Sequence, residues 1–366
     1  MTESQKSQLS SAKKIIFGCI WIALVLILAE AGVRLTGLAD DCSAELTRAL
    51  VCDPILGYRF NPKFKPFGQP FNRAGFRTHE FGPKQPGVYR IVSLGDSSTL
   101  GRIGNKVGWV REPYPQRLEQ IIEERVGPGK VEVFNAGMSA YMSFHGVMLL
   151  RTKLRGLEPD LITVRYGWAD HLMSSMITKS GSVFREPQSA LGRAVEDVLL
   201  QISLYRFARR LGLELQALRR PVADQARAVL AEQTGWKAFI PLPDYKHNLR
   251  RMVEIGHGRG AEVWLLTSPW NPAPARASAT MLGLMNKLSY DQVIEIHRSY
   301  NEATRQVGAE LDVPVVDLEA LYGEHADEVL FIPEDVIHPI QAGHNLEAEA
   351  LYGQLVKAGI LPTSPN

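Results

Sequence analysis

The fold class of this chain is decided by the stretch IVSLGDSST, which covers Ile91–Thr99. Residues with strand character run directly into a Gly-Asp-Ser turn, and a buried strand that ends in this way is typical of the carboxyl edge of a parallel α/β sheet. Ser97 then lies where a helix should begin, with free backbone N–H groups near its hydroxyl. This place suits a nucleophile, because the N–H groups can hold an oxyanion. The alternative is an ordinary strand followed by a helix N-cap.

The alternation of strand and helix patterns continues along the chain. We expect strands at 88–94, 131–134, 160–166, 261–267 and 313–317, and helices at 114–125, 145–157, 244–257, 288–311 and 343–358. Strands that alternate with helices indicate βαβ units, so the sequence predicts a three-layer α/β/α domain with a central, mostly parallel sheet. The functional site should then lie in the loops at the carboxyl ends of the strands.

The composition of the 366 residues, 45% hydrophobic and 22% charged, is that of a globular protein. The net charge of +2 gives no basis for nucleic-acid binding. We expect residues 34–87, rich in Pro, Gly, Phe and Arg, to be an extracytoplasmic lead-in segment without its own core, and residues 88–360 to be the main domain. Within that domain, about 172–235 has helical spacing and many arginines, which predicts a helical insertion with a solvated basic face.

The N-terminus carries an apolar run that starts at Ile15, is preceded by three lysines, and reaches Val33 when Glu30 near its end is tolerated. As a helix these residues cover about 28 Å, roughly the hydrocarbon core of a bilayer. The lysines place residues 1–14 in the cytoplasm and the main domain on the periplasmic or extracytoplasmic side of the inner membrane. Ala29-Glu30-Ala31 resembles a cleavage site, so a removed signal peptide is the alternative. The length of the run favours an uncleaved single-pass anchor at 15–33.

Cysteine usage agrees with export. Cys42 and Cys52 flank a short segment beyond the apolar run, and in an oxidising compartment they could close a nine-residue loop as a disulfide. The alternative is a pair of buried free thiols. Two cysteines without adjacent histidines fall short of a zinc ligand set, so we expect no metal and no other cofactor.

A base for Ser97 is available far along the chain. Asp335 precedes His338 by three residues, so the two side chains can point the same way from one turn of chain. His338 can then accept the serine proton while Asp335 holds the imidazole in the required tautomer. An Asp-x-x-His pattern arises often by chance. Its place just before the last expected helix, combined with the Gly-Asp-Ser turn, makes it a triad candidate.

On these motifs the chain resembles the SGNH (GDSL) hydrolases over about residues 88–358, and a membrane-anchored bacterial branch of them from the N-terminus onward. Gly95-Asp96-Ser97-Ser98 matches the first family block, and Asp335–His338 matches the last. The resemblance implies an SGNH/flavodoxin-like fold, with Ser97 as nucleophile, Asp335 as triad acid and His338 as base. Asn135-Ala136-Gly137 matches the start of the second block, and Gly167–His171 matches the third.

Two departures from the family pattern concern the oxyanion hole, which the resemblance assigns to Ser97, Ala140 and Ala169. The family has Gly at the position of Ala140, where a backbone N–H survives the change. The family has Asn at the position of Ala169, so a side-chain amide is lost, and loss of one oxyanion donor costs on the order of 10²–10³ in rate. Trp168 and His171 are candidate substitute donors. The residues that we expect on the substrate side of the site are Asp96, Trp168, Asp170 and His171.

The resemblance implies a membrane-anchored serine esterase or acyltransferase that acts on a small acyl ester, above all acetyl, of an envelope or extracellular glycan. A lipid ester is the second substrate class. The other hypothesis is a catalytically impaired SGNH domain that serves as an envelope binding or scaffold protein, and Ala140 and Ala169 motivate it. The expected partners are an acylated substrate and the membrane, and the sequence indicates no protein partner.

Overall fold

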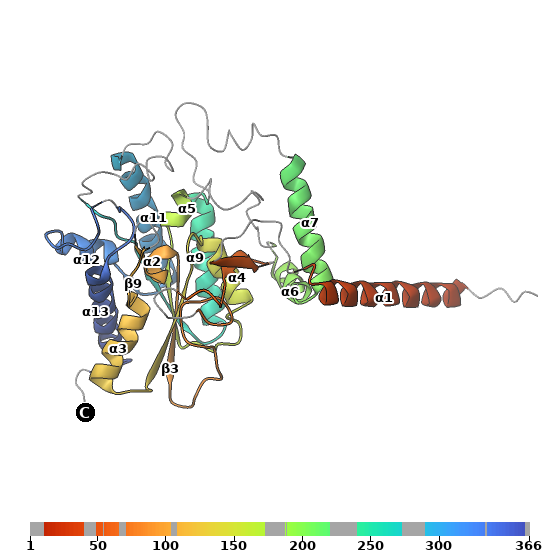
Figure 1. The fold of residues 1–366 in the computed structure, drawn as a ribbon, viewed down its shortest axis with the longest axis horizontal. Coiled ribbons are helices and arrows are strands. Elements are labelled where there is room, and N and C mark those ends of the chain that lie inside the picture. The colour runs from red at the N-terminus through yellow and green to blue at the C-terminus, as the bar shows by residue number, and fades with distance from the viewer. Residues whose placement is uncertain are drawn as a thin grey trace, which may run out of the picture.

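A computed structural model of the chain describes residues 11–39, 49–53, 55–65, 71–103, 108–172, 187, 189–219, 240–272, 290–333 and 335–362. Figure 1 shows a three-layer domain from which one long helix projects sideways. Cys42 lies outside the described residues, so the Cys42–Cys52 disulfide stays a prediction.

The central sheet has five parallel strands in the spatial order β6-β3-β7-β8-β9. These strands are β3 (Tyr89–Gly95), β6 (Val131–Gly137), β7 (Leu161–Arg165), β8 (Glu262–Leu266) and β9 (Val315–Val316). The first of them along the chain, β3, therefore lies between the second and the third. This is the flavodoxin-like order, and the switch point at which ligands bind in such sheets is the carboxyl end of β3.

Helices cover both faces of the sheet because alternate side chains of each strand point to opposite sides. The helices of the domain are α2 (Ser97–Leu100), α3 (Tyr114–Val126), α4 (Ser143–Arg151), α5 (Trp168–Leu172), α9 (Leu242–His257), α11 (Tyr290–Leu311), α12 (Leu318–Glu324) and α13 (Gln341–Lys357). Val92 and Leu94 of β3 pack in an apolar cluster with α4, α9 and α11, whereas Ile91 packs in a second cluster with α3 and α13. The expected α/β/α architecture is confirmed.

Some expected element boundaries were wrong. The helix expected to reach residue 157 ends at Arg151, where the Thr152 hydroxyl donates to the Met148 carbonyl and Leu154 N–H turns back to Leu149 C=O. The expected last strand is reduced to two residues. Pro314 has no N–H to donate, so only its carbonyl reaches β8.

The segment before β3 packs against the main domain. It begins with an antiparallel hairpin of β1 (Leu50–Asp53) and β2 (Gly57–Phe60), and Phe60, Phe71 and Phe76 are buried in the same cluster as α4 and α9. A second short hairpin, β4 (Arg102–Ile103) and β5 (Gly108–Trp109), follows α2. Residues before β3 therefore extend the core of the domain.

The N-terminal helix α1 (Ser11–Thr36) is long and apolar enough to cross a membrane, and a signal sequence would pass the same test. Its C-terminal part packs against α7 (Ser203–Arg219), which follows α6 (Ala190–Leu199). The expected insertion at about 172–235 is thus two helices in its described part. Backbone bonds of Gln201 and Ile202 form a turn between them.

Candidate functional site

Ser97 is held at the end of β3 by a close approach between strand and helix. A Cβ on Gly95 would lie 2.1 Å from the Thr99 hydroxyl, so only glycine lets α2 start this close to the strand. The Asp96 carboxylate accepts from Ser98 N–H at 2.9 Å and caps α2. Ser97 is therefore the first residue of a short helix, at the switch point of the sheet.

The structure brings Ser97 together with the two residues from the far end of the chain. Ser97 Oγ lies 2.8 Å from His338 Nε2, and His338 Nδ1 lies 2.8 Å from Asp335 Oδ2. With Nδ1–H donated to the carboxylate, Nε2 is left to accept the serine proton. Ser97 and His338 each keep 9% of their surface exposed, so both residues are largely buried but still reach solvent.

Asp335 is fixed as an ionised group. Burial raises the pKa of its carboxyl, but the charge and hydrogen bond of His338 and two backbone N–H groups outweigh burial, so the pKa is lowered from its ordinary value. Those N–H groups belong to Ile337 and His338 and donate to Oδ1 at 2.8 and 3.1 Å. Oδ2 therefore remains directed at the imidazole.

The loop that carries His338 is also held by Asn271, which follows β8 in the chain. Asn271 N–H donates to Val336 C=O at 2.9 Å, and the Asn271 side chain donates to Asp335 C=O at 3.1 Å. At the base of the loop, Ile340 N–H donates to Leu330 C=O at 2.9 Å. Three hydrogen bonds to backbone carbonyls thus hold the chain on both sides of His338.

Ala140 lies in a turn after β6 with φ of +59°, a conformation that favours glycine. Tyr141 N–H donates to Met138 C=O at 3.2 Å across this turn, and Ala140 is its third residue, where a type II turn requires a positive φ. Met138 N–H donates to Gly95 C=O at 3.1 Å, which places the turn beside the end of β3. The backbone therefore keeps a glycine-type geometry although the residue is alanine.

Residues of the lead-in segment hold this turn in place through hydrogen bonds. The Tyr58 hydroxyl of β2 donates to Ser139 C=O at 2.5 Å, and the Tyr141 hydroxyl donates back to Tyr58 C=O at 2.6 Å. Both tyrosines are buried. The left-handed residue is thus held between two reciprocal hydrogen bonds.

Ala169 lies in α5, is almost fully buried in the main apolar cluster, and has no side-chain donor. The two candidate substitute donors are engaged elsewhere. Trp168 Nε1–H donates to Pro269 C=O at 3.1 Å. His297 Nε2 faces the Ser268 carbonyl at 2.7 Å, which can only accept, so His297 Nδ1 accepts from His171 Nε2–H at 2.9 Å.

The two acidic residues expected on the substrate side have partners inside the protein. The Asp170 carboxylate accepts from Ser143 N–H at 3.0 Å, from the Ser143 hydroxyl at 2.5 Å and from Gly167 N–H at 3.1 Å. Burial raises the pKa of Asp170 to about 7 and also raises the pKa of Asp96. These contacts tie α5 to α4 and cap α2, which argues against a direct role in substrate binding for either carboxyl.

Some residues that position the site could not be identified from the sequence alone. Tyr58 and Asn271 act through contacts between segments far apart in the chain. Asn135, the first residue of the second family block, donates to Thr99 C=O at 2.9 Å and accepts from Gly137 N–H at 2.9 Å. That block could be found by its motif, whereas the other two residues required the fold.

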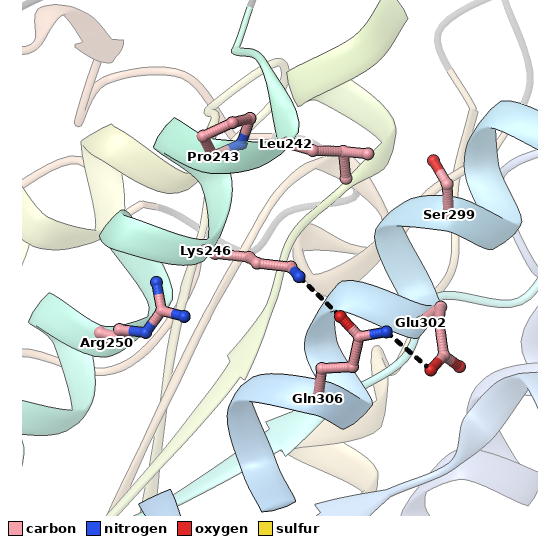
Figure 2. A pocket seen from close by; sticks show the side chains of 7 residues that line it. All are labelled: Leu242, Pro243, Lys246, Arg250, Ser299, Glu302 and Gln306. Carbon is pink, nitrogen blue, oxygen red and sulfur yellow. Dashed lines mark hydrogen bonds between the residues drawn. The ribbon is translucent and has the colours of Figure 1, made fainter. Parts of the chain in front are cut away.

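A groove of about 490 Å³ lies elsewhere, between α9 and α11. Figure 2 shows that Lys246 of α9 reaches Gln306 of α11 across it, and the bond measures 2.6 Å. None of the seven lining residues belongs to the Ser97 site. Among the described residues there is also no group of three or more His, Cys, Asp or Glu that could hold a metal ion.

Comparisons with solved structures give distant likenesses. A lipase/acylhydrolase from Enterococcus faecalis has 18% identity and a TM-score of 0.44, with 76% of this chain and 100% of that chain covered. An acetylxylan esterase from Geobacillus stearothermophilus has 16% identity and a TM-score of 0.42, with 73% and 94% covered. No curated protein matches the chain.

A family model gives the decisive comparison. It matches residues 93–346, a span that begins within β3 and ends after His338. It includes the Ser97, Asp335 and His338 positions whose side chains the fold brings into contact. The chain belongs to the GDSL-like lipase/acylhydrolase family.

Proposed function

We propose that the protein is a membrane-anchored serine esterase, or an acyltransferase of the same mechanism, that acts on a small acyl ester of an envelope or extracellular glycan. The observation that carries this proposal is the continuous hydrogen-bonded chain from Ser97 through His338 to Asp335. Each member has the partner that its chemical role requires, and the chain lies at the switch point of the sheet.

In this mechanism Ser97 Oγ attacks the ester carbonyl while His338 Nε2 takes its proton. The Asp335 carboxylate stabilises the imidazolium that forms. The tetrahedral oxyanion is held by the backbone N–H groups of Ser97 and Ala140. Its collapse returns the proton from His338 to the leaving alcohol and leaves an acyl-serine. Water, or an acceptor hydroxyl in a transferase, then attacks the acyl-serine with His338 again as base.

Two features support a small acyl group on an extracytoplasmic substrate. Ala140 places a methyl group at the turn proposed to hold the oxyanion, and this added volume favours acetyl over longer chains. The apolar helix α1 supports the anchor, with the domain on the side opposite the N-terminal lysines.

The proposal is tested with p-nitrophenyl esters of increasing chain length and with an acetylated polysaccharide, using the full chain in detergent micelles. We expect turnover of the acetate, a steep decline with longer acyl chains and release of acetate from the glycan, all lost in Ser97→Ala. Preference for long-chain esters would favour a lipid substrate. Transfer in place of hydrolysis would appear as acetyl groups on an added acceptor glycan.

Ala169 favours a second candidate function, an SGNH domain that binds an envelope glycan without hydrolysing it. The side-chain donor is missing there, and Trp168 and His171 direct their N–H groups at Pro269 and His297. Under this function the purified protein would bind acetylated glycan equally well with Ser97 or Ala at position 97. It would also release no acetate.

A further inference from the structure

Helix α6 carries a stripe of exposed apolar side chains. Leu191, Val195 and Val198 are 75%, 48% and 66% exposed. With 3.6 residues per helical turn, these three positions fall within an arc of about 60° on the helix surface. Exposed apolar residues scattered singly are ordinary, but three aligned on one short helix indicate a contact surface.

The opposite side of α6 fixes the direction of this stripe. Arg151 of α4 is buried and donates to Glu196 at 3.1 Å and to Asp197 at 2.8 Å. Because these acidic side chains are held against the main domain, rotation of α6 is restricted. The apolar stripe therefore faces away from the domain in a defined direction.

The stripe also lies at a defined place relative to α1. The Glu30 carboxylate of α1 accepts from Ser203 N–H at 3.0 Å and from Leu204 N–H at 2.7 Å, at the start of α7. Glu30 lies three residues before the end of the apolar run at Val33. Figure 1 shows α6 at the base of α1, with α7 running across the axis of α1. A membrane spanned by α1 would thus end at the level of α6.

We propose that the apolar stripe of α6 rests in the headgroup–acyl boundary of the bilayer that α1 spans. This inference depends on the proposed membrane anchor. A lipid surface is the occupant that fits, because the exposed stripe belongs to a helix that lies at the end of the apolar helix α1, close to where the spanning segment ends. Amphipathic helices bind such interfaces in the plane of the membrane. Together with α1, the stripe gives the domain a second attachment and so a fixed orientation above the bilayer.

The test uses the full chain in vesicles of phosphatidylcholine and phosphatidylglycerol, with the photocrosslinker p-benzoylphenylalanine in place of Val198. The matched control has the same replacement at Val329, which is 74% exposed and follows α12 in the chain. Figure 1 shows α12 on the opposite side of the domain from α1. We expect at least fivefold more lipid adducts at position 198. Equal labelling at the two positions, or crosslinks from position 198 to a second copy of the chain, would overturn the proposal.

Flotation of the same vesicles separates the two claims. If the chain fails to float with lipid, the anchor and the stripe proposal both fail. If it floats but position 198 forms no adducts, only the stripe proposal fails. A second variant, Val195→Asp, should reduce lipid adducts at position 198 several-fold and leave turnover of p-nitrophenyl acetate in detergent unchanged. Val329→Asp should change neither quantity.

Discussion

Arg165 Nη1 donates to Glu347 Oε2 at 2.9 Å, and neither side chain has any exposed surface. Arg165 ends β7 beside Gly95, and Glu347 lies on α13, shortly after His338. The pair therefore connects β7, which pairs with the strand that ends beside Ser97, with the helix that follows His338. Burial alone would raise the pKa of Glu347, but the charge of Arg165, together with hydrogen bonds to His344 and Tyr322, outweighs burial and lowers the pKa, so the carboxylate stays charged.

We expect Glu347→Leu to destabilise the protein by about 3–5 kcal/mol, because it leaves Arg165 charged and buried without its partner. Denaturant unfolding at neutral pH measures this cost. The double variant Arg165→Met/Glu347→Leu should recover at least half of it, since the buried charge is then removed. If the destabilisation of the double variant equals the sum of the destabilisations of the two single variants, Arg165 and Glu347 do not act as a unit.

Ala169→Asn should raise turnover of p-nitrophenyl acetate by up to about 10²-fold, because it restores an amide donor to the proposed oxyanion hole. Ala169→Leu is the control, because its side chain has the same number of heavy atoms and the same branching as Asn but no donor. Because the site is almost fully buried, both variants should lose some stability from overpacking. If Asn and Leu have the same kcat, another group already supplies the donor.

Ala140→Gly should preserve activity and stabilise the fold by up to about 1 kcal/mol. A left-handed conformation costs an alanine roughly 1–2 kcal/mol, and the greater freedom of glycine in the unfolded chain offsets part of the gain. Thermal unfolding and kcat/KM are the measurements. We also expect the variant to accept longer acyl chains, since the methyl group is gone. A clear loss of stability would mean that the φ of +59° is not maintained in solution.

Asp335→Asn should change the response of stability to acid. The pKa of Asp335 is lowered below its ordinary 3.8, so its contribution to stability is fully present above that value and is lost as pH falls through the folded pKa. The variant should be less stable than the wild type at pH 7, with a difference that shrinks as pH falls below about 3.8. Unfolding titrations from pH 7 to pH 2.5 measure this convergence. A constant gap across the range would contradict the lowered pKa.

The fold was largely predictable, because buried strands can be recognised in the sequence from short runs of hydrophobic residues. The run at 91–94 predicts β3, and its place before a Gly-Asp-Ser turn identifies the carboxyl edge of the sheet. The break between α6 and α7 was not predictable. The carboxylate that caps α7 comes from Glu30, more than 170 residues earlier in the chain.

The site was predictable only where its residues form motifs. The blocks around Ser97 and His338 are local in sequence, but the positive φ of Ala140 depends on a turn that the sequence does not reveal. The bonds from Tyr58 to the Ala140 turn and from Asn271 to the Asp335 loop join distant segments, so they required the folded chain. The partners of Trp168 and His171 were hidden for the same reason.

The central claim is that Ser97 is activated by His338, and covalent labelling tests it most directly. A fluorophosphonate probe reacts with an activated serine whatever the natural substrate. We predict one adduct on the wild-type chain, mapped by peptide mass spectrometry to Ser97, absent in Ser97→Ala and nearly absent in His338→Ala. An unlabelled wild-type chain that is otherwise folded, or labelling that persists in His338→Ala, would contradict the account.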